Sequence, residues 1–165
     1  PAVLVWGDAL TVALLRARAF TPEDFALSHP AGSLGKRLLL TVADLRHSGA
    51  TLPLVGEQTP LHEAIITMSE KGLGMLVVVN AHGQLSGVFT DGDLRRLFQR
   101  QTQLTEVRMA DIMQPQPHTI GSDKLAVEAL KQMEDNKING LIVIDAHARP
   151  LGALNMHDLL QARIV

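Results

Sequence analysis

The sequence contains no cysteine and no long apolar run. Without cysteine the chain can form no disulfide, thiolate metal site or cysteine nucleophile, which fits a reducing cytoplasm, where we expect the protein to reside. The longest apolar runs, MLVVV from Met75 and LIVI from Leu141, fall far short of the roughly 20 residues that a membrane-spanning helix needs. We therefore expect no membrane partner.

An excess of positive charge is also missing. The 165 residues include 15 Lys+Arg and 17 Asp+Glu, a formal net charge of −2, and only 3% are aromatic. Nucleic-acid binding normally requires a positive face and, for single strands, aromatic rings that stack on bases. We therefore expect no nucleic-acid partner. The 46% of hydrophobic residues are ample for a globular core.

A duplicated unit organises most of the chain. The segment GMLVVVNAHGQLSGVFTDGDLRRLF from Gly74 aligns with NGLIVIDAHARPLGALNMHDLLQA from Asn139. Upstream, VADL from Val42 aligns with MADI from Met109. Self-similarity of this kind indicates that one structural unit has been used twice.

Each unit is predicted to form a short helix, an amphipathic helix, two strands and a closing helix. Apolar runs at 75–79 and 85–89, separated by the turn NAHGQ, predict a hairpin, and 141–144 and 151–154 predict its counterpart. A unit of this size cannot bury both faces of its small sheet alone. We expect an α/β (α+β) fold in which the two copies pack about a pseudo-twofold axis. The predicted repeats span residues 41–98 and 109–165, with a linker at 99–108.

The stretch TDGDLRR, residues 90–96, has two interpretations. Thr90 and Asp93 have the spacing of a helix capping box, and Asn155 and Asp158 repeat it in the second copy. A helix N-terminus also attracts phosphate, and an aspartate there could accept hydrogen bonds from both hydroxyls of a ribose. The pseudo-twofold symmetry would then place two such sites on one shared cleft.

Two further side chains belong to this hypothesis. Arg96 either forms an i,i+3 ion pair with Asp93 or contacts an anion in the cleft. His157 lies within the second motif and could contact a ligand. No metal site is expected, because the one HExxH-like start, His62-Glu63, has Ile66 where the second histidine would stand.

The duplicated unit resembles the CBS domain pair, whose last strand ends in Gly-h-h-[ST]-x-x-Asp. Residues 87–93, GVFTDGD, fit this pattern fully, whereas 152–158, GALNMHD, place Asn155 where the pattern has Ser or Thr. The resemblance implies that Thr90 and Asp93 hold the phosphate and ribose of an adenosine-type nucleotide. It also implies weaker phosphate binding at Asn155 and a retained ribose role for Asp158.

Residues 1–40 lie outside the repeat. WGDALTVALLRARAF predicts one helix, TPEDF begins another, and SHPAGSLG, with Pro30, Gly32 and Gly35, interrupts it beside His29. Because the chain opens on the apolar, helix-like PAVLVWGDAL, we expect it to be a piece of a longer protein.

A wider resemblance covers essentially all 165 residues. GDALTVALLRARAFTPEDFALSHPAGSLGKRLL followed by FTDGDLRR looks like the C-terminal half of the D-arabinose 5-phosphate isomerase family, in which a sugar-isomerase (SIS) domain precedes two CBS domains. The resemblance implies that residues 1–40 are the last helices of a SIS domain and that His29 is an active-site residue. It also implies that the parent enzyme interconverts D-ribulose 5-phosphate and D-arabinose 5-phosphate, on the way to the Kdo of lipopolysaccharide.

Three functions remain in competition. In the first, this chain is inactive by itself because most of the SIS domain is missing, needs no cofactor, and regulates that domain by binding a nucleotide or a nucleotide-sugar such as CMP-Kdo. In the second, the pair binds nothing and only assembles subunits into a homo-oligomer, a dimer or tetramer. In the third, the piece is itself catalytic through His29.

Overall fold

The computed structural model describes residues 39–100 and 104–164. The chain divides into a unit of residues 1–40 and a unit of residues 41–165, and the fold reported below is that of the second. The helices expected in residues 1–38, and His29 among them, lie outside the described residues.

The first repeat contains the predicted elements in the predicted order, together with a 3₁₀ turn and a strand, β1, that were not predicted. It comprises α4 (Val42–Leu45), a 3₁₀ turn (Gly49–Thr51), β1 (Leu54–Gly56), α5 (Leu61–Lys71), β2 (Met75–Val79), β3 (Leu85–Thr90) and α6 (Asp91–Arg100). Helix α5 buries Leu61, Ala64 and Met68 on one face, as their helical spacing predicts. Helix α6 runs to Arg100, two residues into the segment expected to be linker.

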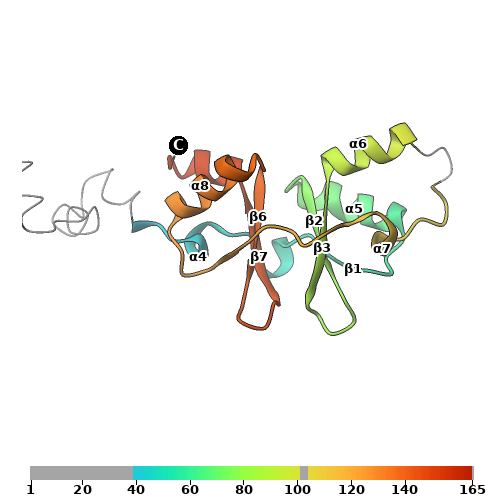
Figure 1. Cartoon of the computed structure of the whole chain (residues 1–165), viewed down its shortest axis with the longest axis horizontal. Helices are drawn as coiled ribbons and strands as arrows, with labels where there is room; N and C mark the ends of the chain where they lie inside the picture. The colour runs from blue at the N-terminus through green and yellow to red at the C-terminus, as the bar shows by residue number, and fades with distance from the viewer. Residues whose placement is uncertain (1–38, 101–103, 165) are drawn as a thin grey trace, which may run out of the picture. The chain divides into compact units, whose positions relative to one another are not determined.

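The second repeat is built in the same way. It comprises α7 (Met109–Ile112), β4 (Gln114–Pro115), β5 (Thr119–Gly121), α8 (Ala126–Asn136), β6 (Gly140–Ile144), β7 (Pro150–Asn155) and α9 (Met156–Gln161). Both predicted hairpins are present, β2–β3 and β6–β7, each as an antiparallel pair (Figure 1). The expected fold class, a duplicated α/β unit, is confirmed. None of the described helices is long and apolar enough to cross a membrane.

Each repeat supplies a segment to the sheet of the other. The first sheet has the order β1-β2-β3-β4, although β4 belongs to the second repeat, and Gln114 pairs there with Val88 of β3. In the three-stranded sheet β5-β6-β7, Ala153 of β7 pairs with His47, which belongs to the first repeat. The backbone N–H of His47 donates to the carbonyl oxygen of Ala153 at 2.8 Å, and the backbone N–H of Ala153 donates to the carbonyl oxygen of His47 at 3.0 Å. The two repeats are therefore interlocked.

Two glycines leave room for the two segments that cross to the other repeat, those around His47 and Gln114, which we call the crossing segments. A Cβ at Gly152 would lie 2.6 Å from the carbonyl oxygen of His47, and a Cβ at Gly87 would lie 2.8 Å from that of Gln114. Both distances are shorter than a van der Waals contact. The glycine that opens each Gly-h-h-x-x-x-Asp motif is thus required by the close approach of another backbone.

The interior has a cluster that joins the repeats. Leu73, Met75 and Val77 of the first repeat pack with Ile142 and Ala153 of the second. A larger cluster around Leu76 and Phe89 of the first repeat also includes Met109 of α7. Burial of apolar side chains on both sides of each hairpin explains why their sequences are nearly continuous apolar runs.

Candidate functional site

A cavity of about 910 Å³ lies where the first turns of α6 meet the second repeat. Its walls come from residues 90–93 at the start of α6, the crossing segment 114–118, and residues 137–140 between α8 and β6. Because these segments belong to both repeats, anything that binds in the cavity contacts both. A volume of this size suits a nucleotide-sized molecule.

Thr90 and Asp93 form the predicted capping box at the edge of this cavity. The backbone N–H and the hydroxyl of Thr90 both donate to Oδ2 of Asp93, at 2.9 and 2.7 Å. The Asp93 N–H in turn approaches the Thr90 hydroxyl oxygen at 3.3 Å. The capping interpretation of this motif is therefore correct for the structure as it stands.

The other oxygen of Asp93 is also occupied. The Arg96 guanidinium donates to Oδ1 at 2.6 Å, the i,i+3 pair expected from the sequence, and the Gln114 side-chain amide donates to it at 3.2 Å. Asp93 is only 6% exposed and is the one buried charged residue within the described part of the chain. Burial alone would raise the pKa of Asp93, but the hydrogen bonds from Thr90 and Arg96 outweigh it and hold this pKa below its usual value.

The second motif repeats the capping box with different partners. The Asn155 N–H donates to Oδ2 of Asp158 at 2.7 Å, and the Asp158 N–H donates to Oδ1 of Asn155 at 3.0 Å. His47 approaches Oδ1 of Asp158 at 2.8 Å, just as Gln114 approaches Asp93. The Asn155 side-chain amide also donates to the Leu73 carbonyl of the first repeat, at 3.3 Å. Asparagine thus supplies a link between repeats for which a Ser or Thr hydroxyl lacks the reach.

Replacing His47 tests this symmetry. We expect His47→Ala to lower the free energy of unfolding by about 1 to 2 kcal/mol, because Asp158 loses its partner from the other repeat. His47→Gln should cost less, because glutamine already makes the equivalent contact at Gln114. Urea denaturation of the two variants measures the difference. Equal losses would show that the side-chain contact contributes nothing beyond filling space.

The structure does not bring all the predicted site residues together. Thr90, Asp93 and Arg96 line the large cavity, whereas Asn155 lies on another cavity of about 400 Å³, together with Asp91. Asp158 and His157 line neither of these two, and exposed His157 contacts Gln161 of its own helix at 2.9 Å. The expected shared cleft with Asp93 and Asp158 on opposite walls is not found in either of them.

Sequence reasoning missed the residues of the crossing segments. Gln114 and His47 each contact the acidic residue of the opposite repeat, yet both stand in stretches without any recognisable motif. The signal was present in the alignment of VADL with MADI, since extending it pairs His47 with Gln114. Arg100 and Lys137, which also line the large cavity, were not predicted as site residues either.

The lowered pKa of Asp93 predicts how stability depends on pH. Because the pKa is lower in the folded protein than in the unfolded chain, ionised Asp93 stabilises the fold above the unfolded value of about 3.9. That contribution is lost as the pH falls below this value through the folded pKa. The pKa values of Asp44 and Asp145 are lowered too, by hydrogen bonds from Thr41 and from Arg149 and His147. The melting temperature of Asp93→Asn should therefore fall less steeply below about pH 4 than that of the native chain. Parallel curves would contradict this assignment.

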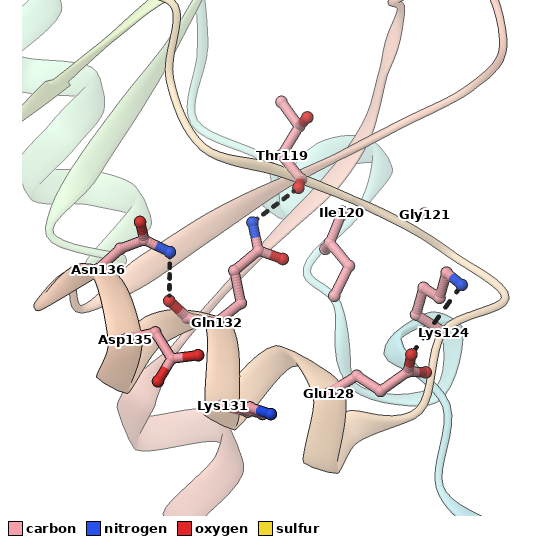
Figure 2. A pocket seen from close by; sticks show the side chains of 9 residues that line it. All are labelled: Thr119, Ile120, Gly121, Lys124, Glu128, Lys131, Gln132, Asp135 and Asn136. Carbon is pink, nitrogen blue, oxygen red and sulfur yellow. Dashed lines mark hydrogen bonds and ion pairs between the residues drawn. The ribbon is translucent and has the colours of Figure 1, made fainter.

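A further cavity, of about 580 Å³, lies beside α8 and β5 (Figure 2). Its charged side chains are balanced, two lysines against two carboxylates, and Lys124 pairs with Glu128 at 3.9 Å. The Gln132 amide donates to the Thr119 carbonyl at 3.0 Å, a bond that Figure 2 shows as a dashed line. We find no set of converging polar groups in it comparable to the one around Asp93.

Comparison with known proteins gives the same two-repeat division. A family model described as "CBS domain" matches residues 42–100 and 109–164. A structure of CBSX2 in complex with AMP is 25% identical, with a TM-score of 0.63, and the match covers 76% of this chain and 96% of that one. The CBS domain pair of protein MJ0100 in complex with 5′-methylthioadenosine and S-adenosyl-L-methionine is 20% identical, with a TM-score of 0.66, and the match covers 73% and 93%.

Curated relatives extend the match to nearly the whole chain. Arabinose 5-phosphate isomerase KdsD of Pseudomonas aeruginosa is 55% identical over 162 residues, and KdsD of Escherichia coli K12 is 46% identical over 164. The alignments cover 98% and 99% of this chain but 50% of either relative. The chain thus spans about half the length of the curated relatives it matches.

Proposed function

The chain belongs to the CBS domain family, and from this premise we propose that it is the regulatory, ligand-binding part of an arabinose 5-phosphate isomerase. The observation that carries the proposal is the cavity that joins Thr90 and Asp93 to the crossing segment of the second repeat. A ligand there contacts both repeats at once, so binding can favour one arrangement of the pair over another. Differential affinity of this kind is what regulation of an attached domain requires.

The proposed ligand is a nucleotide or a nucleotide-sugar, with CMP-Kdo as a candidate. Oδ1 of Asp93 is held by Arg96 and Gln114, two long side chains that can turn away. The hydroxyls of a ribose would take their place, and the freed Arg96 would then be available to a phosphate. CBSX2, the structural relative crystallised with AMP, supports a nucleotide of some kind in this fold.

In the longer protein, the proposed activity is the interconversion of D-arabinose 5-phosphate and D-ribulose 5-phosphate in the cytoplasm. The SIS domain of the same protein is then the partner of this module, and His29 is proposed to act in its active site. Such an aldose–ketose reaction needs an acid/base group that works near neutral pH, and histidine suits it. We expect the 165-residue chain alone to show no isomerase activity. An assay with arabinose 5-phosphate tests this, and turnover by the chain would assign catalysis to it instead.

Calorimetry and thermal melting with AMP, ATP, CMP and CMP-Kdo test the binding proposal. A true ligand should raise the melting temperature as its concentration increases. Asp93→Asn should abolish most of this rise. The matched control is Asp44→Asn, because Asp44 caps α4 through the same contacts to Thr41 but does not line the cavity. Binding that survives Asp93→Asn unchanged would reject the proposed site.

A structural role without ligand is the second candidate. Two observations favour it: the carboxylates of Asp93 and Asp158 are fully engaged within the protein, and five large apolar side chains of the described residues lie on the surface, Leu54, Ile66 and Phe98 among them. Leu54, Ile66 and Phe98 are 46%, 56% and 57% exposed. In this case the pair would assemble a dimer or tetramer and the cavity would stay without a ligand. Light scattering that shows the same oligomer with and without nucleotides, together with no binding in calorimetry, would establish this role.

A further inference from the structure

Four basic side chains line the cavity around Asp93, in a chain whose formal net charge is −2. They are those of Arg95, Arg96, Arg100 and Lys137. The cavity's carboxylates are those of Asp91 and Asp93, and Asp93 is already paired with Arg96. Within residues 39–100 and 104–164, the other three cationic side chains make no hydrogen bond or ion pair. The cavity therefore holds more positive charge than its own carboxylates neutralise.

The internal duplication shows that the fold does not need these cations. Their counterparts in the other repeat are all uncharged, namely Leu160, Gln161, Val165 and Gly72. If the charges served helix formation or packing between the repeats, both copies would gain from them. The cluster instead distinguishes one motif from the other.

Lys137 adds an independent sign of function. It occupies the left-handed backbone region after α8, with φ = 54°, where the equivalent residue after α5 is Gly72, with φ = 64°. Glycine adopts this conformation without steric cost, whereas a residue with a Cβ does not. A lysine in this unfavourable backbone position that also lines the cavity points to a role for its charge.

We propose that Arg95, Arg100 and Lys137 form a second anion-binding subsite, so that the ligand carries at least two separate anionic groups. Nucleoside diphosphates, nucleoside triphosphates and nucleotides with a further acidic group belong to this class; a nucleoside monophosphate does not. The nucleotide part of this inference rests on the proposed function, while the preference for multiple negative charges follows from the cavity itself. Because the cations lie on one motif only, one such site exists in the part of the chain that the structure describes.

Calorimetry with AMP, ADP and ATP, without divalent cations, tests the charge preference on the intact 165-residue chain. ATP should bind at least about tenfold more tightly than AMP, because charge-assisted hydrogen bonds to the added phosphates are among the stronger ones. Arg95→Gln and Lys137→Gly should each reduce the ratio of ATP to AMP affinity severalfold. Lys131→Gln is the matched control, because Lys131 lies on α8 but lines the other cavity, and it should leave the ratio unchanged.

Lys137→Gly carries a second readout that a merely structural lysine would not give. Its melting temperature should be equal to or above that of the native chain, because glycine removes the steric strain of the left-handed backbone at this position. Its affinity for ATP should fall at the same time. A lower melting temperature together with an unchanged affinity ratio would assign Lys137 a structural role and overturn its place in the subsite.

Calorimetry with inorganic phosphate and tripolyphosphate, which carry no nucleoside, distinguishes the proposed subsite from the proposed nucleotide function. If no nucleotide binds but tripolyphosphate does, and Arg95→Gln weakens it, the subsite stands and the nucleotide function falls. If AMP, ADP and ATP bind equally well, the nucleotide function stands and the subsite is wrong. Binding of neither nucleotides nor tripolyphosphate overturns both.

Discussion

Gly152→Ala is expected to lower the free energy of unfolding by about 2 to 3 kcal/mol and the melting temperature by about 5 to 10 °C. The new Cβ would lie 2.6 Å from the carbonyl oxygen of His47. That oxygen belongs to a backbone that is hydrogen-bonded to Ala153 in both directions, so it cannot move aside without breaking the bridge. Gly87→Ala should behave alike, because the carbonyl of Gln114 stands at 2.8 Å. Urea and thermal denaturation measure both effects.

Gly56→Ala is the control for the general cost of replacing a strand glycine. An added Cβ there meets only the Thr59 hydroxyl oxygen, at 3.7 Å, an ordinary contact. Its stability should stay within about 0.5 kcal/mol of the native value, as for substitutions away from packed features. If Gly56→Ala costs as much as Gly152→Ala, the crossing segments do not explain the glycines.

Asp93→Ala is expected to cost about 2 to 4 kcal/mol, more than any other substitution of an acidic residue discussed above. The change removes the cap of α6 and leaves the Thr90 N–H and the Gln114 amide without their acceptor. It also leaves Arg96 without its carboxylate. Because Asp93 is 6% exposed, water replaces these bonds poorly. Chemical denaturation gives the loss directly.

Asp44→Ala provides the comparison for the cap alone. Asp44 accepts from the N–H and hydroxyl of Thr41 at 2.8 and 2.6 Å, the same pattern as Asp93, but it is exposed. We expect a loss of about 0.5 to 1 kcal/mol. A loss at Asp93 no larger than at Asp44 would mean that Arg96 and Gln114 contribute little to stability.

The sequence predicts best those features that depend on residues close to one another in the chain. The hairpin β2–β3 was predicted as residues 75–79 and 85–89, and the structure has Met75–Val79 and Leu85–Thr90. Apolar runs separated by a turn give this result because apolar residues of both strands pack into the two core clusters. The capping boxes of Thr90 and Asn155 were equally readable, since all their atoms come from residues three apart.

The contacts between repeats could not be predicted in the same way. Gln114 stands 21 residues from Asp93, and His47 stands 111 residues from Asp158. No local periodicity reports such pairings, because they depend on how the two sheets meet. The contact between Gln114 and Asp93 was therefore not predicted, and neither was the separation of Asn155 from the cavity that holds Thr90. The glycine of each motif was recognised as part of a pattern, but its physical reason emerged only from the crossing backbone.

The exchange of segments also sets the order in which the protein can be completed during synthesis. The strand partner of His47 lies in β7, the last strand along the described fold, so the segment around His47 leaves the ribosome before its partner and cannot pair until β7 has been made. Before β7 is made, β3 can already pair with β4, but the segment around His47 has no strand to pair with. A first repeat made without the second lacks this partner, and the edge of β3 that β4 covers in the complete fold is left unpaired. We expect chains that end between the repeats to associate with one another through this exposed strand edge.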